Sequence, residues 1–319
     1  MADYPAHLSL RSPGRLCVVG SLSRPVPGGG ESLWESAFHA ISAFNNADFD
    51  IMGDYANLVP FNSEPFVLAV VSVLIMAGGI SVLVLLDIAS KRNWRRLTPS
   101  TNIVLLFSLV LWGAGAGGIL LAEFNNDATL GLLNTTDKLT NSFFQSVTAR
   151  TAGYNSISIG DLRDETLFLI SGLMFIGGVT GSTAGGVKVG TFALLMLATW
   201  ASVRGYEHGQ AFGRRFGHRL VYRAMAIVAM AIMLVFAATL LLTFTEDFLF
   251  RQVLFEVVSA FGTVGLSTGI TPDMTPAGKV IIIVVMFIGR LGPLTLGYAL
   301  ARQHRELRYE LPQRDLPIG

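Results

Sequence analysis

Cysteine is nearly absent from this chain, which carries only Cys17 among its 319 residues. A single cysteine excludes an intramolecular disulfide and any metal site that needs two thiolates. Charge is also scarce: 14% of the residues are charged and the formal net charge is +1, a balance that gives no reason to expect a nucleic-acid partner. The five histidines include no pair at the helical spacing of a zinc site. We therefore expect oxygen-based ion chemistry, with no resident metal and no covalent cofactor.

Apolar residues are abundant instead, at 51% of the chain, and the mean hydropathy is +0.55. A helix needs about 20 apolar residues to cross a hydrocarbon core of roughly 30 Å. Five runs are long enough, near residues 65–89, 102–123, 166–200, 221–245 and 277–300. The third run is too long for one straight span and is rich in glycine, so we interpret it as a broken helix. These runs predict an all-α polytopic membrane protein in the lipid bilayer.

Basic residues concentrate in three connections, at 91–96, 204–223 and 302–308. The positive-inside rule assigns all three to the cytoplasmic side and predicts a cytoplasmic C-terminus. The opposite connections are acidic and contain few bases. We expect cations to arrive from that acidic side, attracted by residues that include Glu123, Asp127, Asp137, Asp161, Asp164, Glu165, Glu246 and Asp247.

Three segments of the chain are versions of one another, at residues 38–48, 144–153 and 255–265. In each, a half-length amphipathic helix ends near a hydroxyl residue (Ser42, Thr148 or Ser259) and continues into a small turn. Repetition at similar spacing indicates repeated architecture. Non-helical backbone at membrane depth is tolerated only where it is buried in protein or lines a water-filled path. We therefore interpret the segments as pore helices followed by the turns of an ion-selectivity filter.

The turn residues are the candidate ion-binding positions: Asn46, Ala47 and Asp48; Thr151, Ala152 and Gly153; Thr263, Val264 and Gly265. A carbonyl cage needs residues that accept a positive φ, and glycine does so without a Cβ penalty. The alternative is that these glycines cap ordinary helices on surface loops. Asp48 stands where the other two copies have glycine, at a conformational cost of roughly 1 kcal/mol. Its carboxylate either adds a cation site or marks an unusual or decayed filter, and both interpretations stay open here.

The glycine-rich break in the third run, Gly177–Gly190, is not a nucleotide-binding phosphate loop. Val187 follows Gly186 where that motif requires lysine, and no strand precedes the break. Glycines there either open the helix inside the membrane or permit close helix packing, and the two interpretations are compatible. Arg290 lies midway along the last run, where an unpaired guanidinium costs at least about 3 kcal/mol. We expect it to face the pore axis or the carbonyls of the break, with pairing in a helix interface as the alternative.

Five strings in this order resemble the Trk/Ktr/HKT superfamily of potassium transporters, specifically the bacterial pore-forming subunit. The strings lie at 42–47, 148–155, 177–188, 259–269 and 289–295. The resemblance covers residues 31–300 and matches the second to fourth of four units around a pseudo-fourfold pore. It divides the chain into a non-homologous segment, a partial unit, two complete units and a cytoplasmic tail, at 1–30, 31–90, 91–204, 205–300 and 301–319.

The resemblance implies potassium uptake across the cell membrane, with Na⁺ or H⁺ as candidate coupled ions. It also implies a homodimer bound to a cytosolic nucleotide-binding regulatory ring. A flexible gate loop beneath the filter is implied as well, with Arg290 as a fixed positive barrier. The gate residues are Gly177, Gly178, Gly181, Ser182, Thr183, Gly185, Gly186 and Arg290.

The main alternative is a truncated, non-transporting membrane scaffold or pseudo-transporter, because no membrane helix precedes the first repeat and residues 1–30 contain no span. We do not expect an enzyme. An intramembrane hydrolase would need a catalytic dyad inside the spans, and none is evident. We interpret Lys188 as a cytoplasmic anchor, His39 as a satisfied pore-helix residue, and Asp161, Asp164 and Glu165 as solvated charges.

Overall fold

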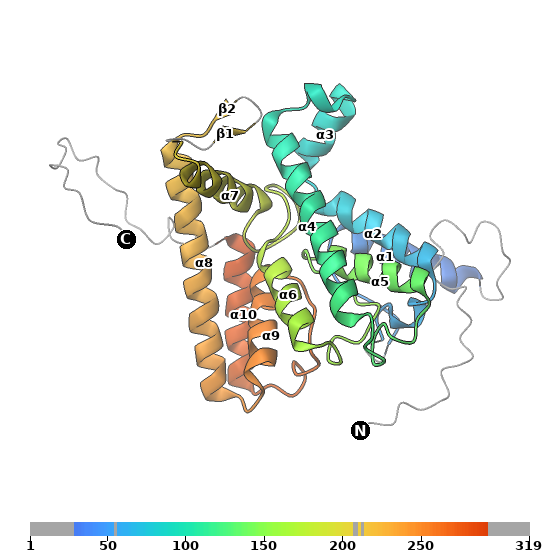
Figure 1. Cartoon of the computed structure of the whole chain (residues 1–319). Helices are drawn as coiled ribbons and strands as arrows, with labels where there is room; N and C mark the ends of the chain where they lie inside the picture. Colours follow the sequence, from blue (N-terminus) through green and yellow to red (C-terminus); the bar gives the residue numbers. More distant parts are fainter. Residues whose placement is uncertain (1–28, 54–55, 207–209, 212–213, 293–319) are drawn as a thin grey trace.

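The computed structural model describes residues 29–53, 56–206, 210–211 and 214–292, and nearly all of its regular structure is helical (Figure 1). The elements are α1 (Gly29–Phe44), η3 (Val59–Phe61), α2 (Pro65–Gly79), α3 (Val82–Lys91), η4 (Trp94–Arg96), α4 (Pro99–Glu123), α5 (Thr135–Thr148), α6 (Asp164–Phe175), α7 (Val189–Val203), β1 (Gln210–Ala211), β2 (Arg214–Arg215), α8 (His218–Thr245), α9 (Phe250–Gly262) and α10 (Pro276–Leu291). The two-residue strands pair antiparallel. The all-α prediction is confirmed.

The three repeated segments form the short helices α1, α5 and α9, of 16, 14 and 13 residues. At 1.5 Å per residue each is about 20–24 Å long, which is too short to cross a hydrocarbon core. Each ends at or just before the turn that the sequence analysis identified. The predicted half-length helices are therefore present in all three copies.

Among the described residues, two helices are long and apolar enough to cross a membrane by themselves, α4 with 25 residues and α8 with 28. They match the second and fourth apolar runs. The first run differs from a single span, because it forms α2 and α3 with a bend of 99° between them. Ser81 explains the new start, since its side chain accepts a hydrogen bond from Leu83 N and caps α3.

The third apolar run is broken as predicted, into α6 and α7 with non-helical backbone at residues 176–188 between them. α10 has 16 residues up to Leu291. The remainder of the fifth run lies outside the described residues, as do most of the 1–30 segment, the basic residues at 302–308 and the 301–319 tail.

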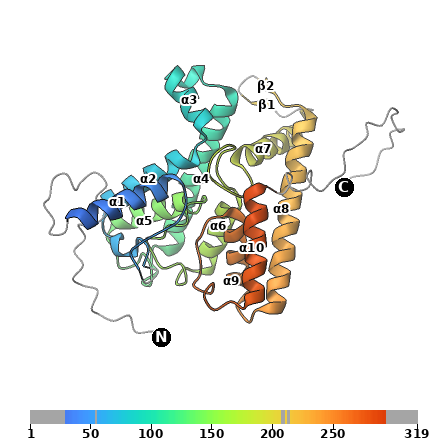
Figure 2. The same cartoon turned by 180° about the vertical axis from the view of Figure 1, so that it is seen from behind.

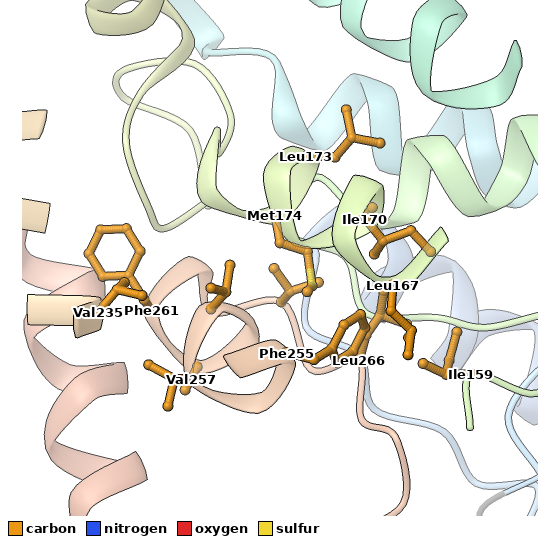
Figure 3. Packing of buried hydrophobic residues seen from close by; sticks show 14 of the residues in the cluster. Ile159, Leu167, Ile170, Leu173, Met174, Val235, Phe255, Val257, Phe261 and Leu266 are labelled. Carbon is orange, nitrogen blue, oxygen red and sulfur yellow. The ribbon is translucent and has the colours of Figure 1, made fainter. Parts of the chain in front are cut away.

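The main apolar core lies between α6 and α9 (Figure 3). Leu167, Ile170 and Met174 on α6 point toward Phe255 of α9 and Leu266 in the turn that follows it. This core joins the second repeat to the third. Burying each of these side chains contributes about 1.5–3 kcal/mol, so the position of the third turn relative to the second depends on this packing.

Large apolar side chains cover much of the outer surface of the long helices. Phe236, Leu241 and Phe244 on α8 and Leu109 and Leu121 on α4 are all exposed. A soluble protein does not leave so much apolar surface in water, whereas lipid accommodates it. Figures 1 and 2 show α8, α9 and α10 side by side in one half of the molecule and α1, α2 and α5 in the other.

The described basic connections share one end of the molecule. Figure 1 places α3, the β1–β2 hairpin and the start of α8 at the top, opposite the α4–α5 and α8–α9 connections. The arginines of the hairpin and of the start of α8 are exposed, namely Arg214, Arg215, Arg219 and Arg223. This grouping agrees with the orientation that the positive-inside rule predicts.

Candidate functional site: three convergent turns and a glycine-rich loop

The three turns share a backbone conformation. Positive φ angles alternate with an ordinary one in each triplet, at Asn46 (50°) and Asp48 (55°), Thr151 (77°) and Gly153 (84°), and Thr263 (51°) and Gly265 (102°). Left-handed conformations at alternate residues rotate successive peptide groups, which is what a ladder of inward carbonyls requires. Asp48 adopts the left-handed conformation that the sequence analysis expected at this position.

Each turn also closes onto its own helix in the same way. The amides of Ala47, Gly153 and Val264 donate to the carbonyl oxygens of the shared hydroxyl residues Ser42, Thr148 and Ser259, at 3.0, 3.3 and 2.9 Å. In every copy the donor lies five residues after the acceptor. The second copy is one residue shorter before its triplet, so its donor is the last triplet residue, whereas the donor is the middle residue in the other two copies. A conserved closure with conserved dihedral angles is not explained by unrelated surface caps.

Side-chain and backbone contacts bring the turns together. Asn46 Nδ2 donates to Thr151 Oγ1 at 3.4 Å, which joins the first turn to the second. Asn57, which follows the first turn, accepts a bond from Asn155 N at 3.2 Å. The Tyr154 hydroxyl donates to Ser42 Oγ at 2.5 Å. All three turns meet at Gly153, where an added Cβ would lie less than 3.0 Å from Val264 O and from the Asp48 carboxylate.

The glycine-rich break lies directly against this cluster. It is a loop whose two ends are joined, with Gly177 N donating to Val187 O at 2.8 Å. A Cβ on Gly185 would lie less than 3.0 Å from Gly262 O and from Thr263 Oγ1 in the third turn. Val179 N donates to Gly79 O at 3.2 Å. The loop therefore touches the third turn and the bend between α2 and α3, and its glycines permit that close approach.

Three basic side chains donate to carbonyls of this loop: Arg150 to Gly177 O at 3.0 Å, Lys188 to Ala184 O, and Arg290 to Thr183 O. Arg290 thus contacts a carbonyl of the break, one of the placements that the sequence analysis expected. The ammonium group of Lys188, which we interpreted as a cytoplasmic anchor, turns back onto the loop. Arg150 was missed. It is buried, with its guanidinium 5.2 Å from the ring centre of Trp112 and without a carboxylate partner among the described residues.

Buried carboxylates stabilise the connections on the opposite side. Glu123 accepts bonds from the side chains of Asn126, Thr129 and Thr166 and from Arg163 N. Glu256 on α9 likewise accepts from residues 267–271 just after the third turn, and Glu246 accepts from Thr275. Glu123 and Glu246, which the sequence analysis listed among the acids that attract cations, are buried and hydrogen-bonded within these connections. Asp161, Asp164 and Glu165 are exposed as expected, and Asp164 pairs with Arg251.

His39 is buried on α1, and only half of its bonding capacity is used. Its Nδ1 lies 2.7 Å from Glu35 O, whereas Nε2 has no hydrogen-bond partner within the described residues. Within those residues no cluster of three or more His, Cys, Asp or Glu side chains is arranged to hold a metal ion. The chemistry of the site is that of backbone carbonyls, hydroxyls and one carboxylate.

Replacing Glu123 with alanine should lower the free energy of unfolding by about 2–4 kcal/mol, because several buried donors lose their acceptor. The expected result is a clear fall in the thermal denaturation midpoint of the detergent-purified protein. Glu165→Ala is the matched control, since that nearby glutamate is exposed. Equal midpoints for the two variants would show that the Glu123 hydrogen bonds do not stabilise this connection.

Short helices, turns that meet in the interior and long lipid-compatible helices together define an α-helical membrane protein with three repeated helix-and-turn segments. Comparison with known proteins agrees. A family model described as "TrkH: Cation transport protein" matches residues 21–306. The chain belongs to this family of cation transporters, which are not enzymes.

Several curated relatives are similar over most of the chain. The Ktr system potassium uptake protein B of Bacillus subtilis is 41% identical over 89% of this chain and 64% of its own length. The potassium/sodium uptake protein NtpJ of Enterococcus hirae is 38% identical over 92% of this chain and 66% of its own length. This chain therefore spans just under two thirds of the length of these relatives. The crystal structure of the potassium transporter TrkH from Vibrio parahaemolyticus shares the fold, with 19% identity, a TM-score of 0.70, and coverage of 84% of this chain and 58% of that one.

Proposed function

We propose that this protein is the pore-forming subunit of a potassium uptake system in the cell membrane. Potassium ions would exchange hydration water for carbonyl oxygens of the three turns. The four-unit pore that this chain resembles has a fourth turn, which would complete the ring of carbonyl oxygens around the ion. The main support is the convergence of three turns with the same alternating φ pattern at Gly153. The names of the curated relatives, which are potassium or potassium/sodium uptake proteins, support the same ion.

The loop at 176–188 is proposed as the gate of this path. It touches Thr263 of the third turn, and it is itself contacted by three positive side chains. A loop of this kind impedes a cation in two ways, by occupying the path and by presenting positive charge to it. Na⁺ or H⁺ remains the candidate coupled ion, and sodium is favoured by the potassium/sodium relative.

We further propose a homodimer that binds a cytosolic nucleotide-binding regulatory ring at the basic end of the molecule. The exposed arginines of the hairpin and of the start of α8 would meet acidic groups on that partner. The C-terminal tail would lie on the same cytoplasmic side. A ring bound there would lie next to α7, which follows the proposed gate loop directly in the chain. Movement of the ring could therefore be transmitted to that loop through α7.

Potassium uptake should be measured in a potassium-uptake-deficient bacterial host that expresses the protein as its own gene encodes it. We expect growth at limiting potassium and ⁸⁶Rb⁺ accumulation well above the empty-vector control. The alternative hypothesis, a non-transporting scaffold, predicts normal membrane insertion without growth at limiting potassium and without ⁸⁶Rb⁺ accumulation. Insertion without ion uptake, both in cells and in liposomes with the co-purified partners, would refute the transport proposal.

A further inference from the structure

The side chain of Asp48 lies between the turns of the other two copies. A Cβ on Gly153 and a Cβ on Gly265 would each lie less than 3.0 Å from the Oδ2 atom of Asp48. A Cβ on Gly153 would also lie less than 3.0 Å from Val264 O. One carboxylate oxygen and one carbonyl oxygen of the third turn thus lie close together, packed against Gly153.

This carboxylate lacks a positive partner among the described residues. Its other oxygen, Oδ1, accepts one bond from Asn57 Nδ2 at 3.4 Å, and the described salt bridges involve Asp87 and Asp164 instead. A partly buried carboxylate with a single long amide contact is poorly compensated, because desolvation penalises its charge. A bound cation would supply the missing compensation.

The combination of ligands favours one class of ion. Carbonyl oxygens alone carry no net charge, so they discriminate weakly in favour of divalent ions. A full negative charge attracts a divalent cation with twice the Coulomb energy of a monovalent one at equal distance. Ca²⁺ takes six to eight oxygen ligands in flexible geometry, from carboxylates, backbone carbonyls and water.

We propose that Asp48 and Val264 O form a calcium-binding site inside the filter, at which Ca²⁺ blocks the passage of monovalent cations. The inference rests on the proposed function, since block is defined only for a conducting path. It adopts the first of the two interpretations of Asp48, in which the carboxylate adds a cation site. The two other copies cannot provide such a site, because they carry glycine at this position.

The test uses the protein as its gene encodes it, purified and reconstituted in liposomes. ⁸⁶Rb⁺ uptake is titrated with external Ca²⁺ up to about 10 mM, which exceeds the range of weak extracellular calcium sites. Asp48→Asn keeps the size of the side chain and its tolerance of the left-handed region, while it removes the charge. We expect the half-blocking Ca²⁺ concentration to rise about tenfold or more in this variant.

Asp48→Gly provides a second variant, because it restores the residue of the other two copies and guards against a folding defect. Asp50→Asn is the matched control, since it removes an equal charge two residues away, whose Oδ1 accepts a bond from the neighbouring Met52 N. The control should keep the wild-type Ca²⁺ sensitivity. Insensitivity of the wild type to Ca²⁺, or equal block of wild type and Asp48→Asn, would overturn the proposal.

Equilibrium binding of ⁴⁵Ca²⁺ to the purified protein separates this inference from the transport proposal. Asp48-dependent binding without any ⁸⁶Rb⁺ flux would support the calcium site and refute potassium transport. Flux without Asp48-dependent binding or block would support transport and refute the site.

Discussion

Alanine at position 153 should reduce potassium uptake about a hundredfold and lower the preference for potassium over sodium. The added Cβ would lie less than 3.0 Å from Val264 O and the Asp48 carboxylate, and φ at this residue is 84°. The turn must shift to relieve the overlap, and a displacement of about 1 Å of a positioning group can cost about a hundredfold in rate. Uptake of ⁸⁶Rb⁺ and ²²Na⁺ into liposomes measures both effects.

The chain offers a control that separates crowding from backbone strain. Gly269 also has a positive φ, 94°, but a Cβ there would meet nothing within 4 Å. Gly269→Ala should therefore carry only the cost of the left-handed conformation, about 1–2 kcal/mol of stability, with selectivity unchanged. Equal loss of selectivity in both variants would show that strain alone is responsible, and unchanged selectivity in Gly153→Ala would refute the filter assignment.

Gly265→Ala should resemble Gly153→Ala, because its Cβ would overlap the same Asp48 oxygen. The double substitution Gly265→Ala with Asp48→Gly removes that overlap. The remaining effect is the conformational strain of alanine at a φ of 102°. Partial recovery of uptake in the double variant would confirm that the two positions face one another across the path. Absence of any recovery would place the damage in the backbone of the third turn.

The sequence predicts the local parts of this site well, because local parts depend on residue type. Glycine at positions 153 and 265 favours a positive φ, and aspartate tolerates it at position 48. Amphipathic stretches between polar turns and apolar runs identify α5 and α9 as half-length helices. The glycine-rich stretch from Gly177 correctly predicts the interruption between α6 and α7.

Contacts between distant residues were not predictable from the same patterns. The Asp48 carboxylate meets Gly153 and Gly265 only because core packing brings the three turns together. Glu123 appears in the sequence as one acid in an acidic connection, but four neighbouring residues donate to it in the folded chain. Hydrogen-bond donors spread over more than forty residues leave no periodic signal.

The bend between α2 and α3 illustrates a conflict between hydropathy and tertiary contact. Residues 65–89 are apolar throughout, which favours one continuous helix. A continuous helix would keep the Gly79 carbonyl within its own hydrogen-bond ladder, whereas in the structure this carbonyl accepts from Val179 N of the glycine-rich loop. In the same loop, Ala184 O accepts a hydrogen bond from the ammonium group of Lys188. A hydrophobicity scale contains no information about the partners of the Gly79 carbonyl and of the Lys188 ammonium group.

Excision of residues 179–185 should raise monovalent cation flux, because it removes the tip of the gate loop without separating its ends. Those ends are already joined, by bonds from Gly177 N to Val187 O and from Val189 N to Gly178 O at 2.8 and 3.1 Å. α6 and α7 therefore keep their connection in the shortened chain. The measurement is ⁸⁶Rb⁺ flux into liposomes, with detergent-solution gel filtration as the check on folding.

Arg290→Ala should raise the same flux by a smaller factor. A unit charge about 8 Å from a permeating cation contributes about 2 kcal/mol at an effective dielectric constant of about 20, which corresponds to roughly thirtyfold in rate. The variant also releases Thr183 O, which the guanidinium binds. Lys279→Ala is the matched control, because it removes an exposed positive charge from the other end of α10.

Flux in the control should equal that of the wild type. A fall in flux in both the excised chain and Arg290→Ala, with normal gel-filtration profiles, would contradict the gate and identify the loop as a packing element. A rise only in the excised chain would assign the barrier to the backbone of the loop. In that case Arg290 would act through its bond to Thr183 O, and Arg290→Lys, which keeps a positive donor, should behave like the wild type.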